Sequence, residues 1–458
     1  MSDGLLSVLG KIVGDDHVIP GEVVRARPPA WQTHQPCNAK VLVLPASTSE
    51  VADVLRACFE AGQPVVPYGG VTNLVQACAT QDGDIALSLD RMDHIEEVDV
   101  TAQTLTAGAG VTLREAQLAA DAEGLFYPVD IGARDNCTLG GTISTNAGGT
   151  KVIRYGMTRD NVLGLEAVLA DGTVLSSMNR YIKNNSGFDL KHLFIGTEGV
   201  LGVVTRVVMR LAVRPASHNV ALLACTTYDD VQQVLRESRR LLGGTLCGFE
   251  VMWNSFYREV TVPAGRQPAP IPPEFPFYVL VEAMGSDPAA DDESFATAMS
   301  TLFGGDCVAD GVIAKSDSER EAIWAIRHDV EWIVSGAHNF DVSLKVADVG
   351  DYVRDVTDGI QRAMPQALVA AFGHLGDNNI HVSVIARDGS ELDTAAVEEQ
   401  IYRNLVPYRG AISAEHGIGL EKRAWLSLCR TEQEIEIMRT LKKTLDPRNI
   451  LNPGKILP

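Results

Sequence analysis

Three glycine-rich loops between residues 67 and 202 constrain the fold of this 458-residue chain more than any other feature. They are Pro67–Leu74, Thr138–Gly149 and Gly196–Gly202. Adjacent glycines let the backbone approach a ligand closely and turn N–H groups toward its oxygens. Each loop by itself is equally well explained as a tight turn. Because three occur together, and the second is also rich in hydroxyl and amide side chains, they favour a pyrophosphate-binding site.

The loops do not fit two common nucleotide-binding motifs. No Gly-Lys-Ser/Thr follows any of them, which argues against a Walker P-loop. None has the G-x-G-x-x-G pattern opening a helix after a first strand. A Rossmann-type NAD site is therefore disfavoured.

Length and composition indicate an ordinary globular protein of two or three domains, with 45% hydrophobic and 21% charged residues. The net charge of −20 argues against nucleic acid and anionic lipid as partners. An anionic substrate would need a local cationic site.

The sequence contains no run of 18 apolar residues, so no membrane-spanning helix is predicted. The N-terminus has no basic region and predicts a short amphipathic helix rather than a signal peptide. Eight cysteines without a C-x-x-C pair suggest reduced thiols and a cytoplasmic location.

The local patterns predict two α+β domains. We expect an N-terminal helical segment over residues 1–37, a first domain over 38–213, a second over 214–431, and a C-terminal segment over 432–458. Helices are expected over 49–61, 112–123, 228–242, 287–303, 316–335, 351–364 and 432–445. Strands are expected over 40–45, 86–89, 163–170, 201–211, 278–284, 340–346, 367–374, 380–386 and 411–415. Ser49 and Thr112 are the expected helix caps, and Pro263–Pro276 is a proline-rich loop.

Four side chains near the C-terminus suggest chemistry. His374 and His381 end the predicted strands on either side of a tight turn, so their imidazoles can bind one divalent ion. A His-x6-His spacing alone is usually chance. Glu415 can complete a two-histidine, one-carboxylate set, which leaves the neighbouring His416 free to act as a base. The same three ligands would also suit a metallohydrolase.

Together, these motifs resemble a known family. The three loops, with Arg154-Tyr155-Gly156 and Arg159–Leu165 between them, are similar to the vanillyl-alcohol-oxidase-type flavoproteins. The group most similar is that of the D-2-hydroxyglutarate, D-lactate and glycolate dehydrogenases. The resemblance runs from about residue 38 to the end of the chain. It implies an α+β fold with a vanillyl-alcohol-oxidase-type FAD-binding domain and an α+β substrate (cap) domain built on an antiparallel sheet.

The resemblance implies which residues hold FAD. The first two loops would hold the diphosphate, while the third loop and Asn452–Lys455 would close over the flavin. The implied cofactor residues are Pro67, Gly69, Gly70, Val71, Thr72, Asn73, Leu74, Cys137, Thr138, Gly140, Gly141, Ser144, Asn146, Gly148, Gly149, Glu198, Gly199, Val203 and Asn452. Some family members attach FAD covalently through a histidine in the first loop. No histidine stands there in this chain, so we expect non-covalent FAD.

The resemblance also bears on the metal and the base. The family pattern H-x-G-D-G-N-x-H with a later E-H-G is matched except at Asn378, where glycine is usual. Asparagine tolerates the left-handed conformation, so the turn can survive. The implied ligands of zinc or manganese are His374, His381 and Glu415. We expect the cation to polarise the substrate 2-hydroxyl, His416 to take its proton, and the C2 hydrogen to pass as hydride to flavin N5.

The substrate contacts are less clearly defined. Arg327 stands where the family keeps a carboxylate-binding arginine. The hydroxyglutarate enzymes use a lysine at the place of Asn339, a departure that weakens a hydroxyglutarate assignment. On a strand, residues 339, 341, 343 and 345 would share one face, so Lys345 is a candidate replacement. D-2-hydroxyglutarate, D-lactate and D-malate all stay open as substrates.

The expected function is FAD- and metal-dependent oxidation of a D-2-hydroxy acid to the 2-oxo acid. The electrons would pass to an electron-transfer flavoprotein, a quinone or a cytochrome rather than NAD. The alternatives are an oxygen-using oxidase and a glycolate-oxidase-type FAD subunit of a larger complex. Family members often form dimers, so a homodimer is expected on the resemblance alone.

Overall fold

A computed structural model describes residues 3–26, 36–263, 266–334 and 336–458. The chain divides into two compact units. Unit 1 comprises residues 1–149, 156–214 and 415–458, and unit 2 comprises 150–155 and 215–414. Among the described residues, no helix is long and apolar enough to cross a membrane.

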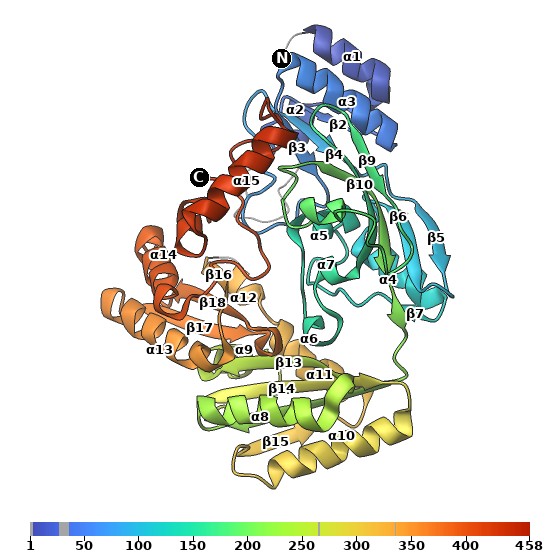
Figure 1. Cartoon of the computed structure of the whole chain (residues 1–458). Coiled ribbons are helices and arrows are strands. Elements are labelled where there is room, and N and C mark those ends of the chain that lie inside the picture. The colour runs from blue at the N-terminus through green and yellow to red at the C-terminus, as the bar shows by residue number, and fades with distance from the viewer. Residues whose placement is uncertain (1–2, 27–35, 264–265, 335) are drawn as a thin grey trace. The chain divides into compact units, whose positions relative to one another are not determined.

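Unit 1 contains a four-stranded sheet in the order β1-β2-β4-β3. Its strands are β1 (Val18–Pro20), β2 (Val41–Val43), β4 (Ile85–Ser88) and β3 (Val65–Tyr68). β2, β4 and β3 are parallel, and β1 is antiparallel to β2. The C-terminal tail returns to this sheet, because Leu451 forms a bridge with Val65. Figure 1 shows the helix before that tail, α15 (Glu432–Leu445), near the blue strands of this sheet.

A second, antiparallel sheet in unit 1 has five strands in the order β5-β6-β10-β8-β9. They are β5 (Ile95–Asp99), β6 (Thr104–Gly108), β10 (Val203–Arg210), β8 (Val162–Val168) and β9 (Val174–Ser177). A short pair joins β7 (Leu125–Phe126) to β11 (Ala212–Val213). The helices of unit 1 are α1 (Asp3–Val13), α2 (Gly21–Arg25), α3 (Thr48–Ala61), α4 (Leu113–Ala122), α5 (Leu139–Thr145), α7 (Thr158–Asn161) and α15, with 3-10 turns η1 (Asp15–His17), η2 (Leu190–Leu193) and η6 (Arg423–Leu428).

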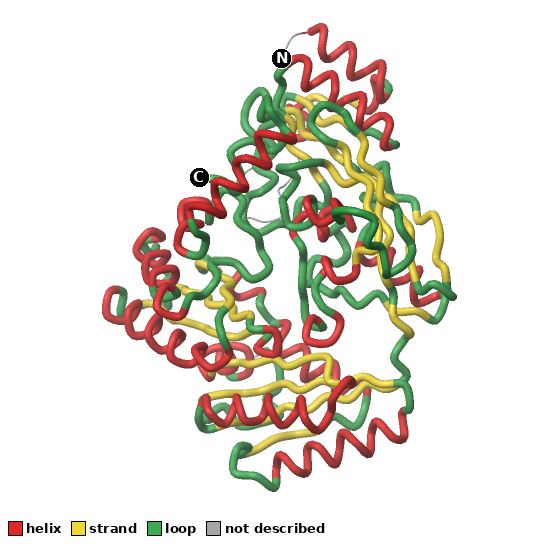
Figure 2. The backbone as a smooth tube through the Cα atoms, viewed as in Figure 1, coloured by secondary structure: helices red, strands yellow, loops and turns green. Residues whose placement is uncertain are grey.

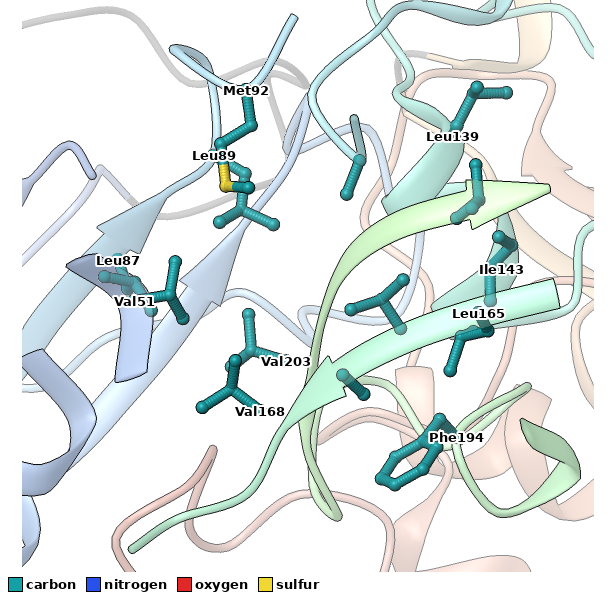
Figure 3. Packing of buried hydrophobic residues seen from close by; sticks show 14 of the residues in the cluster. Val51, Leu87, Leu89, Met92, Leu139, Ile143, Leu165, Val168, Phe194 and Val203 are labelled. Atoms are coloured by element: carbon teal, nitrogen blue, oxygen red, sulfur yellow. The ribbon is translucent and has the colours of Figure 1, made fainter. Parts of the chain in front are cut away.

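One hydrophobic core joins the sheets and helices of unit 1. Figure 3 shows Val51 of α3 beside Leu87 of β4, and Val168 beside Val203 from two neighbouring strands of the larger sheet. Leu139 and Ile143, both fully buried, come from the same face of α5 because they are four residues apart. The opposite face of that short helix is therefore left for other contacts.

Two helix starts test the predicted caps. Thr112 caps α4 in a reciprocal capping box with Glu115, as expected. The expected cap Ser49 is wrong, because Ser47 is the residue whose hydroxyl accepts from Glu50 N. Ser47 has the extended backbone of an N-cap, and the helix begins at Thr48.

Unit 2 is built on a seven-stranded antiparallel sheet in the order β15-β12-β14-β13-β17-β18-β16. Figure 2 shows its yellow strands running side by side with red helices along them. The strands are β15 (Asp310–Ile313), β12 (Ser217–Cys225), β14 (Phe277–Gly285), β13 (Leu246–Trp253), β17 (Ala367–Gly373), β18 (Asn379–Ala386) and β16 (His338–Ser343). The helices are α6 (Val152–Tyr155), α8 (Tyr228–Leu242), α9 (Asn254–Thr261), α10 (Pro288–Phe303), α11 (Asp317–His328), α12 (Glu331–Val334), α13 (Val346–Ala363) and α14 (Thr394–Arg403), with 3-10 turns η3 (Gly243–Thr245), η4 (Leu375–Asp377) and η5 (Val406–Tyr408).

One face of this sheet carries both apolar and charged side chains. Tyr278 and Leu280 of β14 belong to a core that also contains Phe256 of α9 and Trp324 of α11. The cross-strand register places Glu250 opposite Leu280, so this carboxylate lies on the same face as that core. One face of the sheet therefore combines an apolar core with buried charge.

Four predicted elements between residues 316 and 415 need correction. The helix expected over 316–335 is two helices, because α11 ends at His328 and α12 starts at Glu331. The strand expected over 340–346 ends at Ser343, and α13 begins at Val346 rather than at residue 351. The strand expected over 411–415 is a single bridge between Ala411 and Ser343.

Candidate functional site

A cavity of about 300 Å³ lies within unit 1. Its walls come from all three glycine-rich loops, from the 131–133 segment, from residues 415 and 416, and from the C-terminal tail. All predicted cofactor residues line it except Asn146 and Gly149. The predicted ligand Glu415 and the predicted base His416 also line it. Lining residues not predicted from the sequence are Tyr68, Ala77, Cys78, Leu89, Ile131, Gly132, Ala133, Thr142, Thr145, Ala147, Gly202 and Val204. The fold therefore gathers one site from loops that are far apart in the chain.

Close packing of loop backbones shapes the cavity. A Cβ on Gly70 would lie 1.8 Å from the carbonyl oxygen of Asn136, which is backbone and cannot rotate away. Thr138 caps α5 by accepting a hydrogen bond from Gly141 N. Because Leu139 and Ile143 bury the other face of α5, Gly140, Gly141 and Ser144 are presented to the cavity.

Three non-glycine residues with a left-handed backbone line this cavity. Val71 has φ +54°, Glu198 +51° and Asn452 +41°, and all three line the wall. Such conformations cost roughly 1–3 kcal/mol in non-glycine residues and gather at ligand sites. Asn146, with φ +51°, caps the end of α5 and accepts a hydrogen bond from Arg159 N, so it shapes the loop from behind the wall.

Two asparagines in the wall carry buried polar atoms that have no partner among the described residues. Asn73 Oδ1 accepts from the N–H groups of Val75 and Ala77, which leaves Nδ2 unsatisfied. Asn452 Nδ2 donates to the carbonyls of Ala77 and Glu198, which leaves Oδ1 unsatisfied. A buried unsatisfied polar group costs roughly 1–3 kcal/mol, so these two atoms indicate a polar ligand.

The cavity wall contains two buried thiols and two carboxylates that accept backbone hydrogen bonds. Burial raises the pKa of the thiols of Cys78 and Cys137 to about 12, so both are neutral wall groups. Burial also raises the pKa of Glu198, opposed by hydrogen bonds from the N–H groups of Ile418 and Gly419. Oε1 of Glu415 accepts from Gly149 N at 2.6 Å. That contact accounts for Gly149, which holds a carboxylate of the wall without lining the cavity.

In unit 2, the expected histidine pair forms. β17 and β18 are antiparallel with Phe372 opposite His381, and a 3-10 turn at Leu375–Asp377 joins them. The rings of His374 and His381 lie 5.3 Å apart between centroids, and each offers a nitrogen within 4.8 Å of the other. Asn378 has φ +77°, which confirms that asparagine takes the left-handed position of this turn.

Glu250, which was not anticipated from the sequence, organises this cluster. Nδ1 of His374 lies 2.7 Å from one oxygen of Glu250, and Nε of Arg327 donates to the other at 2.8 Å. Burial opposes ionisation of Glu250, but the charges of His374 and Arg327 outweigh it and lower its pKa to about 2. The ionised carboxylate must accept from His374, so Nδ1 of that ring carries the proton in this contact.

Arg327 is buried and only partly satisfied. It is 5% exposed, its guanidinium lies over the ring of Phe372, and Glu250 is its only hydrogen-bond partner among the described residues. The two terminal nitrogens can therefore make a bidentate contact with a carboxylate.

The other two predicted substrate residues lie differently from what was expected. The Asn339 amide donates to the carbonyl of Ile333 and accepts from the hydroxyl of Ser383, so it is engaged within unit 2. Lys345 does not share a strand face with Asn339, because β16 ends at Ser343 and Lys345 is the exposed N-cap of α13. The strand argument for Lys345 is therefore wrong.

Comparison with known proteins identifies the family. Residues 39–177 match the model of the FAD binding domain, and residues 214–456 match that of the C-terminal domain of FAD linked oxidases. The chain belongs to the FAD-linked oxidase family. It is 37% identical over 99% of its length to a probable mitochondrial D-2-hydroxyglutarate dehydrogenase of Oryza sativa subsp. japonica, covering 81% of that protein. It is 32% identical over 99% of its length to a putative mitochondrial D-lactate dehydrogenase of Schizosaccharomyces pombe, covering 90% of it.

A solved structure supports the fold. The structure of p-cresol methylhydroxylase with bound substrate aligns with 100% of this chain and 97% of its own, with a TM-score of 0.78 and 14% identity. The predicted fold class is confirmed, namely an FAD-binding domain with a cap domain built on a large antiparallel sheet. Within its family, the chain is an FAD-linked 2-hydroxyacid dehydrogenase.

Proposed function

We propose that this FAD-linked enzyme oxidises a D-2-hydroxy acid of the D-2-hydroxyglutarate, D-lactate or D-malate class, with His416 as the general base. One observation carries the proposal: His416 lies in the wall of the cavity formed by the three glycine-rich loops. A base in that wall stands beside the cofactor that the loops would hold. A general base must lie within hydrogen-bond reach of the proton that it takes.

The cavity suits FAD held without a covalent bond. Its lining glycines let the loop backbones contact the cofactor closely, and the unsatisfied Asn73 Nδ2 and Asn452 Oδ1 offer a donor and an acceptor. When bound, FAD supplies the acceptor for the hydride that leaves substrate C2. No histidine stands in the loop Pro67–Leu74, so the flavin should separate from the polypeptide on acid precipitation.

The proposal includes a divalent cation held by His374, His381 and Glu415. The antiparallel turn supports the two imidazoles as ligands, and Glu250 orients the first of them. The amide of Ala414 donates to Asp341, the cross-strand neighbour of His381, and Glu415 is the next residue in the chain. When bound, zinc or manganese would lower the pKa of the substrate hydroxyl, whose proton His416 then takes.

Arg327 supplies the local cation that an acidic chain needs for an anionic substrate. Its two terminal nitrogens would bind the carboxylate, while Glu250 holds its Nε. Asn339 carries no charge and is already hydrogen-bonded to Ile333 and Ser383. This arrangement provides a charge for one substrate carboxylate, and D-lactate, D-malate and D-2-hydroxyglutarate all stay within the proposed class.

Anaerobic spectroscopy tests the function. The purified protein is mixed with D-lactate, D-malate, D-2-hydroxyglutarate or glycolate, and the visible band of the oxidised flavin is followed. We expect one D-2-hydroxy acid to bleach it, and turnover with an artificial dye but not with NAD. Peroxide formation in air would instead identify an oxygen-using oxidase.

The base is tested by comparing His416→Ala with His94→Ala, which changes an exposed histidine outside the cavity wall. His416→Ala should slow bleaching by about 10²–10⁴-fold while FAD stays bound. His94→Ala should behave like the wild type. Unchanged bleaching in the His416→Ala variant would refute the assignment of the base.

A further inference from the structure

Glu198 of the third glycine-rich loop makes its main contacts with the segment that carries His416. Its side chain is buried, with 7% of the residue exposed. Oε1 accepts a hydrogen bond from Ile418 N at 2.7 Å, and Oε2 accepts one from Gly419 N at 2.9 Å. Hydrogen bonds from backbone N–H groups to a carboxylate are among the stronger ones in proteins. Both oxygens of Glu198 are thus used to hold the backbone just after His416.

The glycines around Ile418 make this contact possible. A Cβ on Gly417, which has φ +85°, would lie 2.6 Å from Oε1 of Glu198. A Cβ on Gly419, with φ +50°, would lie 2.0 Å from the carbonyl oxygen of Val75. The Gly-x-Gly after His416 therefore lets this segment pack between Glu198 and Val75, the residue that follows the first loop.

Other contacts fix both partners of this clamp. Asn452 donates to the carbonyl of Glu198, whose φ of +51° is strained for a residue with a side chain. Leu420 N donates to the carbonyl of Val75, and Ile456 N donates to that of Gly419. The His416 segment is consequently held by Val75, which directly follows the first loop, by the third loop and by the C-terminal tail.

We propose that Glu198 is a positioning residue, which holds the backbone of Ile418 and Gly419 so that His416 stands at a fixed place in the cavity wall. This inference rests on the proposed role of His416 as base. It assigns the Glu198 carboxylate to the base segment rather than to direct binding of the cofactor. A displacement of about 1 Å in a reacting group can slow catalysis by about 100-fold. The clamp holds Ile418, two residues after His416, so loosening it should change the rate.

The first test substitutes Glu198→Gln, which keeps the shape but presents an amide NH₂ to one of the two backbone N–H groups. We expect anaerobic flavin reduction at saturating substrate to slow by about 10–100-fold, with FAD affinity and KM changed by less than that. Glu166→Gln is the matched control: Glu166 is also buried in unit 1, accepts from Thr48, and does not line the cavity. Its reduction rate should equal that of the wild type.

Gly417→Ala disturbs the same contact between Glu198 and the His416 segment in a second way. Its methyl group would collide with Glu198 Oε1 while the carboxylate itself stays unchanged. It should show the same loss of reduction rate with FAD retained. If either variant loses FAD affinity in proportion to its rate, Glu198 serves the cofactor and the proposal is overturned.

A double-mutant cycle with His416→Ala gives the decisive readout, because residues that act through one another are not additive. If Glu198 acts through His416, Glu198→Gln should change the slow residual rate of His416→Ala by less than about 2-fold. An equal loss in both backgrounds would overturn the role of Glu198 while leaving His416 as base. A wild-type rate in His416→Ala alone would overturn both proposals.

Discussion

Nδ1 of His374 lies 2.7 Å from a carboxylate oxygen of Glu250, a residue 124 positions earlier in the chain. The second oxygen of Glu250 accepts from Arg327. One buried carboxylate therefore connects a proposed metal ligand with the proposed anchor of the substrate carboxylate. A carboxylate that accepts from a ligating histidine fixes the tautomer of the ring and raises its basicity.

Glu250→Gln should weaken metal binding. The amide oxygen or NH₂ would still face His374, but without the charge that favours the ligand tautomer, so we expect affinity to fall about 10–100-fold. Titration of metal-free protein with zinc or manganese measures this loss. Glu166→Gln, which changes a buried carboxylate of unit 1, should leave the affinity unchanged. Equal affinities in wild type and Glu250→Gln would argue against His374 as a ligand.

Arg327→Lys should impair substrate binding more than chemistry. Lysine cannot hold Glu250 through one nitrogen and a carboxylate through two others. A hydrogen bond to a charged group contributes about 1.5–3 kcal/mol, so KM should rise roughly 10–100-fold. Steady-state kinetics with an artificial dye measure KM and kcat separately. Arg354→Lys changes an exposed arginine and should match the wild type. An unchanged KM in Arg327→Lys would exclude the carboxylate contact.

Gly70→Ala should reduce FAD content. Its Cβ would stand 1.8 Å from the backbone oxygen of Asn136, so the first and second loops would have to separate. Overpacking of this kind costs about 1–3 kcal/mol, and FAD affinity should fall by about 10-fold or more. The ratio of flavin to protein absorbance after gel filtration reports the loss. Gly244→Ala, where no heavy atom lies within 4 Å of the added Cβ, is the control.

The folded protein should become less stable in acid, because Glu282 of unit 2 is protonated there. This fully buried carboxylate pairs with Lys151 and lies 2.5 Å from Nε2 of His218. Burial raises its pKa, but the charges of Lys151 and His218 outweigh that and lower the pKa to about 2. A group whose pKa is depressed on folding stabilises the protein above its unfolded pKa of about 4.5, and this contribution is lost as pH falls toward 2.

Glu282→Gln tests this pH dependence. Removing one partner of a buried ion pair should lower stability at neutral pH by about 3–5 kcal/mol. Thermal unfolding of wild type and variant between pH 7 and pH 3 is the measurement, and the difference should shrink as the pH falls. A difference that stays constant over this range would show that Glu282 does not titrate with folding.

Several features could be predicted from the sequence because short stretches encode them. The helices α8 and α15 begin and end at the residues predicted for them, 228–242 and 432–445. Thr112 and Glu115 form a capping box within four residues. The turn at Asn378 needs only the tolerance of asparagine for a left-handed backbone. Strand and helix ends in the 316–346 region were misjudged, because the apolar pattern continues across Asp329 and Ser343 while the backbone turns there.

The sequence by itself determined the family, the glycine-rich loops and the histidine pair, since each depends on residues that are neighbours in the chain. Only the tertiary structure decided which partners these residues find. Glu250 pairs with His374 and Arg327 across strand and helix, and Glu198 meets Ile418 from 220 residues away. The residues next to a glutamate in the sequence do not show whether its side chain will be buried against distant partners or exposed to solvent. Its role follows from the fold, which removes it from water and leaves it the backbone N–H groups, histidine or arginine that compensate its charge.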